Sequence, residues 1–196
     1  FSERKLRRVL ERMLDETEFL APHGIRSLSK FHLENPYVFH WDGEEHRVKY
    51  LPGESDSGMF GGNSNWRGPV WVPVTFLLIR GLFQRYSYFG DAFQIEFPTG
   101  SGQLATLYDV ALEIGRRIVS LFLDDGEGRC PALGSDKPFQ TDPNWKDHFL
   151  FYEYFHGDDG AGVGASHQTG WTGCVATLLM TLERLDPEAF AEHETT

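Results

Sequence analysis

The chain has 196 residues, of which 40% are hydrophobic and 24% are charged, so it is long enough and apolar enough to form one ordinary domain with its own core. Its 18 basic and 29 acidic side chains give a formal net charge of −11 at pH 7, which excludes nucleic acid as a favoured partner but leaves a neutral sugar open. Two cysteines, Cys130 and Cys174, make no disulfide framework, and neither a signal peptide nor a membrane-spanning run is evident, so we expect a cytoplasmic location and no membrane partner.

Apolar residues at helical spacing predict four helices and therefore an all-α fold. The first helix follows a candidate N-cap at Ser2 and is expected to end between Phe19 and Pro22. The second begins near Gly68-Pro69, where proline suits a first helical turn, and ends near Gly90. The third and fourth are expected over 103–123 and from about 169 onward, with the tail 186–196 frayed.

Long, glycine-rich connections separate these helices. Residues 23–68 show no helical pattern, and a connection of this length inside a compact domain is usually functional. Segments 129–133 and 148–155 fit short strands or extended loops. The alternation of helices with long loops is what a toroid of helical hairpins gives, although a plain helix bundle gives a similar pattern.

Three stretches, 50–71, 148–156 and 162–173, concentrate aromatic, polar and glycine residues. Glu153 is the lone carboxylate among five aromatic residues of the second stretch, and in an extended segment it shares a face with Phe151 and Phe155. The structural interpretation is an edge strand with Glu153 in solvent or in a salt bridge. The functional interpretation is a carboxylate in an aromatic cleft that performs acid–base chemistry. The residues alone leave both open.

The first stretch offers groups that suit a sugar. Asn63, Asn65 and Arg67 carry donors for hydroxyl groups, and the ring of Trp66 stacks well on a sugar face. The alternative is a tight loop whose Asn side chains bond their own backbone, and it fits Asn63 equally well.

Other constellations point away from cofactors. Glu153 and His156 have the spacing of a di-metal bundle motif, but such a site needs that motif twice, so we expect no metal. The glycines of 160–164 precede no βαβ pattern, which argues against a nucleotide site. Ser166 lacks the Gly-x-Ser-x-Gly context of a serine hydrolase.

Three blocks, in this order, resemble C-terminal motifs of glycoside hydrolase family 63. They are Gly62-Asn-Ser-Asn-Trp-Arg-Gly-Pro-Val-Trp71, Phe151-Tyr-Glu-Tyr-Phe-His-Gly-Asp158 and Ser166-His-Gln-Thr-Gly-Trp-Thr-Gly173. The likeness extends from about Pro22 to Leu185 and is to the bacterial branch, whose enzymes act on α-glucosides or on glucosyl- and mannosylglycerate. The family also includes the processing α-glucosidase I of eukaryotes.

The resemblance implies an (α/α)6 toroid and hydrolysis of a terminal α-linked sugar with inversion, the substrate being an oligosaccharide or a small glycoside. It places the general base on Glu153, with Tyr152, Tyr154 or Arg67 stabilising its charge. Together with the residue types it predicts substrate contacts at Asn63, Asn65, Trp66, Arg67, Trp71, Tyr152, His167 and Trp171. Trp171 and His167 are expected to border the same cleft as Glu153, although a core position fits Trp171 equally well.

The family's general acid is an Asp upstream of the first block, and no stretch of this chain matches its surroundings. Because the chain also begins with Phe1 and offers about four of the twelve helices of a toroid, we expect residues 1–196 to be the C-terminal portion of a longer catalytic domain. Such a portion needs the N-terminal part as its partner and is inactive alone. The alternatives are a non-catalytic carbohydrate-binding module and a purely structural helical domain.

Overall fold

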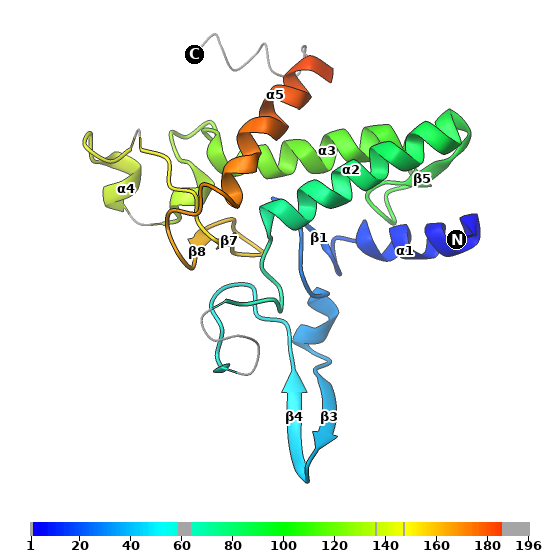
Figure 1. Cartoon of the computed structure of the whole chain (residues 1–196), viewed down its shortest axis with the longest axis horizontal. Helices are drawn as coiled ribbons and strands as arrows, with labels where there is room; N and C mark the ends of the chain where they lie inside the picture. The colour runs from blue at the N-terminus through cyan, green and yellow to red at the C-terminus, as the bar shows by residue number, and fades with distance from the viewer. Residues whose placement is uncertain (1, 59–63, 136, 147, 186–196) are drawn as a thin grey trace.

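The computed structural model describes residues 2–58, 64–135, 137–146 and 148–185 (Figure 1). Within these residues the α-helices are α1 Glu3–Met13, α2 Val72–Phe89, α3 Leu107–Val119, α4 Lys137–Thr141 and α5 Val175–Leu185. The strands are β1 Leu20–Ala21, β2 Gly24–Ile25, β3 Tyr37–Trp41, β4 Glu44–Val48, β5 Gln94–Glu96, β6 Leu104–Thr106, β7 Tyr154–Phe155 and β8 Gly162–Val163. The strands pair two by two, and each pair is antiparallel: β1 with β2, β3 with β4, β5 with β6, and β7 with β8. Each pair is a separate two-stranded sheet.

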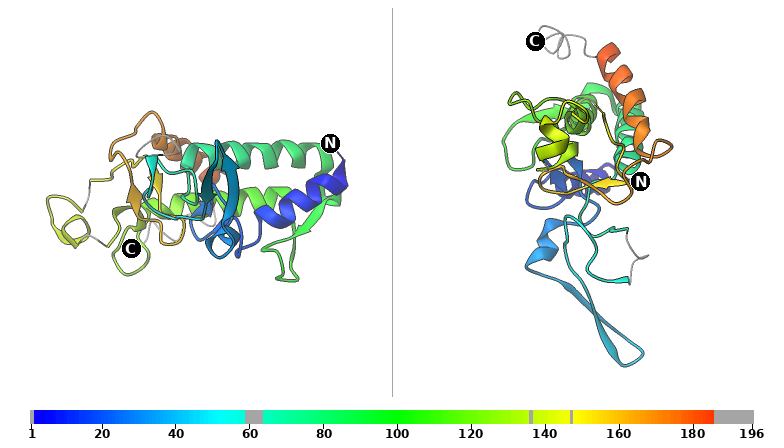
Figure 2. Two further views of the ribbon diagram at one scale, coloured as in Figure 1. Left: turned by 90° about the horizontal axis from the view of Figure 1, so that it is seen from below. Right: turned by 90° about the vertical axis from the view of Figure 1, so that its left-hand side faces the viewer.

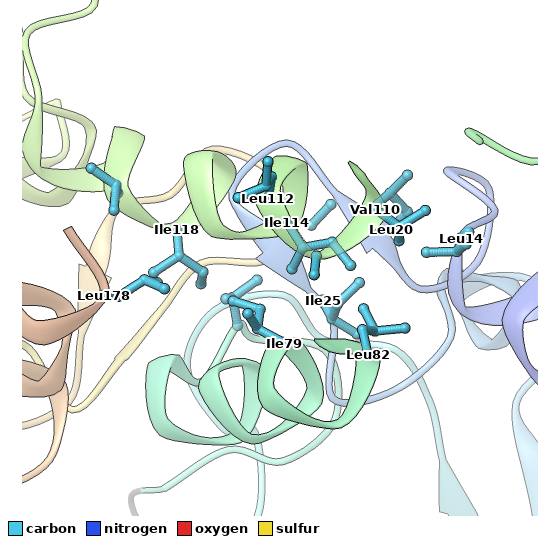
Figure 3. Close-up of a cluster of buried hydrophobic side chains, with 14 of the residues drawn as sticks. Leu14, Leu20, Ile25, Ile79, Leu82, Val110, Leu112, Ile114, Ile118 and Leu178 are labelled. Atoms are coloured by element: carbon cyan, nitrogen blue, oxygen red, sulfur yellow. The ribbon is translucent and has the colours of Figure 1, made fainter. Parts of the chain in front are cut away.

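The core lies between the long helices. α2 and α3 run side by side, and α5 packs across α3 (Figure 1). Ile79 of α2, Ile114 of α3 and Leu178 of α5 point into one buried cluster that β1 and β2 close on another side (Figure 3). α3 and α5 approach each other closely at Gly115. A Cβ at this position would lie only 3.0 Å from both methyl carbons of Leu182. Glycine at this position therefore sets the spacing of the two helices.

The four predicted helices are present as α1, α2, α3 and α5, and the short α4 was not predicted. α1 ends at Met13, so the predicted end between Phe19 and Pro22 is wrong. The reason is local: the Asp15 carboxylate accepts hydrogen bonds from the amide and hydroxyl of Thr17, an arrangement that competes with helix continuation. The chain then turns into β1.

Helix ends elsewhere follow the capping rules in part. Ser2 occupies the N-cap of α1, but its side chain makes no capping hydrogen bond. α3 begins at Leu107, later than predicted, because a reciprocal pair of Thr106 and Asp109 caps it after β6. α2 ends at Phe89 with Gly90 as its C-cap, close to the predicted end, and Gly90 has φ of +58°. Three other predicted bounds are wrong: α2 begins at Val72 and not near Gly68-Pro69, α3 ends at Val119 and not at 123, and α5 begins at Val175 and not near 169.

The connection 23–68 holds ordered structure that was not predicted. β3 and β4 form a hairpin that projects from the body of the molecule, as Figure 1 and the right-hand view of Figure 2 show. Its turn is Asp42-Gly43 with φ of +53° and +81°, the signature of a two-residue type I′ loop. Tyr37 and Trp41 on this hairpin are 60% and 73% exposed.

The segments 129–133 and 148–155 are mostly irregular. Pro131–Leu133 forms a short 3-10 helix, and strand structure in the second segment is confined to β7. The tail 186–196, predicted to fray, lies outside the described residues. The toroid stays a prediction.

Candidate functional site

The three stretches singled out in the sequence lie side by side: the first pairs with the second at the start of α2, and the second pairs with the third through β7 and β8. Val70 bridges Phe155 on one side and Arg26 on the other. The amide of Val70 donates to the carbonyl of Phe155 at 2.8 Å, and the amide of Phe155 returns a bond to Val70 at 2.9 Å. The Trp-Arg-Gly-Pro block is therefore the middle segment of a three-segment arrangement, with the aromatic-Glu-Tyr block as its neighbour.

Glycines make this close approach possible. A Cβ at Gly157 would overlap the carbonyl of Gly68 and lie 2.8 Å from the hydroxyl of Tyr50. Gly68 itself has φ of +149°, and a Cβ there would lie 2.7 Å from both the carbonyl of Leu51 and the Tyr50 ring. Neither position has room for a side chain.

Glu153 immediately precedes β7 and is half-buried. Its Oε1 accepts a hydrogen bond from the Ser64 hydroxyl at 2.5 Å, and its Oε2 accepts a longer one from the amide of Ala165 at 3.3 Å. The backbone amide of Glu153 donates to the Ala165 carbonyl at 2.8 Å. Gly164, with φ of +77°, packs against this carboxylate. A Cβ at Gly164 would be 2.8 Å from Oε2. The carboxylate is thus held by hydrogen bonds from two different loops.

An aromatic column stands next to this carboxylate. The indole of Trp66 stacks on that of Trp71 with ring centroids 3.8 Å apart and planes 5° apart, and Trp71 stacks on Tyr154 at 4.8 Å. Trp66 is 43% exposed, whereas Trp71 is 3% and Tyr154 0% exposed. The column therefore presents a single open ring, and its inner end is the residue that follows Glu153.

Tyr154 stays protonated at physiological pH. Burial raises the pKa of its phenol, and the negative charges of Glu153 and Glu54 raise it further.

Asn65 and Arg67 were predicted to contact substrate, but their polar side-chain groups form hydrogen bonds to other groups of the protein. The Asn65 amide donates to the carbonyls of Leu51 and Gly53 at 2.8 and 2.6 Å and accepts from the Arg67 backbone and side chain. Arg67 donates to Asp56 at 2.9 Å and to Ser55 at 2.7 Å. Both residues are buried, and the geometry favours a role in shaping loop 51–56 over direct contact with a sugar.

Of the remaining predicted contacts, Trp171 and Tyr152 pack against neighbouring residues, whereas His167 is exposed. Trp171 meets Trp71 edge-on at 6.1 Å, and its indole N–H is buried without a hydrogen-bond partner among the described residues. Tyr152 is half-buried, and its ring fills the space that a side chain at Gly162 would need. His167 is exposed, with its ring 6.4 Å from that of Phe151. Asn63 lies outside the described residues.

A charged cluster that the sequence did not reveal lies next to the paired segments of the site, since Arg26 pairs with Val70. Asp158 Oδ1 accepts hydrogen bonds from Arg26 Nη2 at 3.1 Å, Lys30 Nζ at 3.0 Å and the Tyr50 hydroxyl at 3.1 Å. Arg26 is 5% exposed and also donates to the carbonyl of Leu20 at 2.6 Å. Partial burial on its own would raise the pKa of Asp158, but the bonds from Lys30, Arg26 and Tyr50 outweigh it and lower that pKa. Burial raises the pKa of Tyr50, which keeps the phenol protonated as a donor.

Within the described ranges, no group of three or more His, Cys, Asp or Glu side chains is arranged to hold a metal ion. Among the helices of those ranges, none combines the length and the apolar character needed to cross a membrane.

No protein-family model matches the chain. An uncharacterized protein of Saccharomyces cerevisiae is 53% identical over 174 residues, which are 88% of this chain and 16% of that protein. A probable mannosyl-oligosaccharide glucosidase of Schizosaccharomyces pombe is 24% identical over 177 residues, 89% of this chain and 15% of that protein. The mannosyl-oligosaccharide glucosidase of Saccharomyces cerevisiae is 24% identical over 176 residues, with the same two shares, 89% and 15%.

The chain thus spans between 15% and 16% of the length of these relatives. Over most of its residues it is similar, at low identity, to two glucosidases. All three relatives are yeast proteins, so the expected likeness to the bacterial branch of the family gains no support from them.

Proposed function

We propose that the chain forms one side of the active site of an inverting glycosidase, within a longer protein of the (α/α)6 type that removes a terminal α-linked glucose or a related sugar. The observation that carries this proposal is the carboxylate of Glu153, fixed by Ser64 and Ala165 beside an aromatic column with one open ring. The printed names of two relatives as glucosidases support the choice of sugar.

Inversion requires two carboxyl groups with different tasks. One protonates the leaving oxygen, and the other removes a proton from a water molecule on the opposite face of the sugar, at a separation of roughly 6.5–9.5 Å. Glu153 is the proposed base. It is half-buried and hydrogen-bonded on both oxygens, which suits a group that must be ionised and precisely oriented. The acid is proposed to come from another part of the longer protein.

The aromatic column supplies a place for the sugar. A pyranose ring has an apolar face, and the open face of Trp66 is the matching surface. Because Trp71 and Tyr154 are buried beneath it, the outer ring has little freedom to tilt. A sugar stacked on Trp66 is therefore held at a fixed position relative to Glu153, the residue that precedes Tyr154.

A non-catalytic carbohydrate-binding domain is the second candidate. The exposed ring of Trp66 favours it, since stacking alone is enough to bind a sugar. The two candidates differ in whether Glu153 matters for anything beyond binding.

Assays of the full-length protein that contains this chain test the proposal. We expect hydrolysis of an aryl α-glucoside and of an α-linked disaccharide, with the β-anomer as the first sugar detected by NMR. Release of the α-anomer would contradict inversion, and binding without hydrolysis of any α-glucoside would favour the carbohydrate-binding domain.

Replacement of Trp66 tests the aromatic column. An aromatic stack contributes about 0.5–1.5 kcal/mol beyond its buried area, so Trp66→Ala in the full-length protein is expected to raise KM for an α-glucoside by roughly tenfold. Trp41→Ala is the matched control, because that indole is exposed at the end of β3. An equal KM for wild type and Trp66→Ala would show that the sugar does not stack there.

A further inference from the structure

Ser64 touches the proposed base directly, although no sequence pattern assigned it a role. Its hydroxyl donates to Glu153 Oε1 at 2.5 Å across 89 residues of chain. A serine hydroxyl carries one proton, and here that proton is committed to the carboxylate. Charge-assisted O–H to carboxylate bonds of this length are among the strong hydrogen bonds of proteins.

The two oxygens of Glu153 are held unequally. Oε1 has the short bond from Ser64, whereas Oε2 has the longer bond from the Ala165 amide at 3.3 Å. Gly164 packs close to Oε2, since a Cβ there would approach that oxygen to 2.8 Å. Oε2 therefore has only the longer bond and is the oxygen with spare acceptor capacity.

Ser64 is itself held in place by its neighbour. The side chain of Asn65 is fully buried and bonds the carbonyls of Leu51 and Gly53, which ties this end of the loop to the segment before it. Ser64 is thus the contact through which a well-anchored loop reaches the carboxylate.

From this arrangement we propose that Ser64 is a positioning residue for the reaction: it fixes Oε1 and so directs the proton of the attacking water to Oε2. This inference rests on the proposed function. As the water oxygen bonds to the anomeric carbon, its proton passes to Oε2, and the glycosidic oxygen leaves with the proton of the general acid. The proton of Ser64 stays on Ser64 throughout.

Substitutions of Ser64 in the full-length protein test this assignment. Loss of a hydrogen bond to a charged group predicts that Ser64→Ala lowers kcat by about 10- to 100-fold, with KM changed by less than about threefold. Ser64→Thr retains the hydroxyl and is expected to stay within about threefold of wild type. Ser64→Cys carries a weaker donor and is expected to lie between the two.

The split between kcat and KM, together with rescue by Ser64→Thr, separates positioning from a merely structural effect. A positioning residue acts on the chemical step, so the loss is expected in kcat, and the hydroxyl of Ser64→Thr is expected to restore it. Ser87→Ala removes a hydroxyl on the exposed face of α2 and should leave both constants unchanged.

The outcomes distinguish this inference from the proposed function. An active wild type whose Ser64→Ala variant keeps its kcat overturns the role of Ser64 alone. A rise in KM without a fall in kcat also overturns it, because that result assigns Ser64 to substrate binding. If the Ser64→Ala variant does not fold, the other two variants decide. A kcat of Ser64→Thr above that of Ser64→Cys supports the role, and the reverse order overturns it. A wild type without activity on α-glucosides overturns the proposed function, and this inference with it.

Discussion

Glu153→Gln in the full-length protein is expected to lower kcat for an α-glucoside by about 10²–10⁴-fold, the usual contribution of a general base. The amide keeps the shape of the side chain and its contact with Ser64, but it cannot take the proton of the water. KM is expected to change little, because the sugar is held by other groups. Steady-state kinetics on an aryl α-glucoside measure both constants.

Glu127→Gln is the matched control, since its carboxyl group is 71% exposed on the loop after α3. It removes the same charge from the chain and should leave kcat unchanged. A wild-type rate in Glu153→Gln would contradict the assignment of Glu153 as base and leave the carbohydrate-binding domain as the better interpretation.

Arg26→Met is expected to have the largest effect on local stability. It removes a buried guanidinium that bonds Asp158, Tyr50 and the Leu20 carbonyl, and breaking a buried ion pair costs about 3–5 kcal/mol. Lys30 still neutralises Asp158 in the variant, which places the expected loss at the lower end, about 3 kcal/mol.

Hydrogen exchange on the full-length protein measures this loss where it occurs. The amides of Val70 and Phe155 bond each other's carbonyls next to Arg26, and their protection should fall by about 100-fold. Arg47→Met breaks an exposed ion pair with Glu45 and should change protection by less than about fivefold. Unchanged protection of Val70 and Phe155 in Arg26→Met would show that the cluster does not hold the site together.

The same cluster gives a pH dependence of known sign. Because the pKa of Asp158 is lowered in the folded protein, its stabilising contribution is complete above the ordinary carboxyl pKa. That contribution is lost as the pH falls through the lowered value. The protection of Val70 and Phe155 should therefore decrease on acidification in wild type, and less so in Arg26→Met.

The helices could be predicted from the sequence because their apolar spacing reflects burial against one core. Their ends depend on single side chains: Asp15 stops α1 early, and Thr106 with Asp109 starts α3 late. The β3–β4 hairpin carried a readable signal in Asp42-Gly43, but it projects from the core, so no burial pattern marked its strands.

Some residues of the candidate site could likewise be predicted from the sequence, and others could not. Glu153 and Trp66 stand out in the sequence as a lone carboxylate and an aromatic ring in dense aromatic stretches, and the family resemblance turned that signal into a proposed role. Ser64 and the pair of Arg26 and Asp158 could not be predicted, because their contacts join residues 89 and 132 positions apart. Asn65 is the opposite case: its residue type suggested a sugar contact, whereas both polar atoms of its side chain are hydrogen-bonded within the protein.

The stack of Trp66 on Trp71 also makes the site visible to light. Two indoles 3.8 Å apart and nearly parallel share their electronic excitation, so the pair gives an optical signature distinct from that of separate tryptophans. Only the outer ring is open to water, and a molecule that covers it replaces that water with its own surface. A ligand that covers Trp66 is therefore expected to change the intrinsic emission and the circular dichroism of the pair, which would report binding without turnover and without a label.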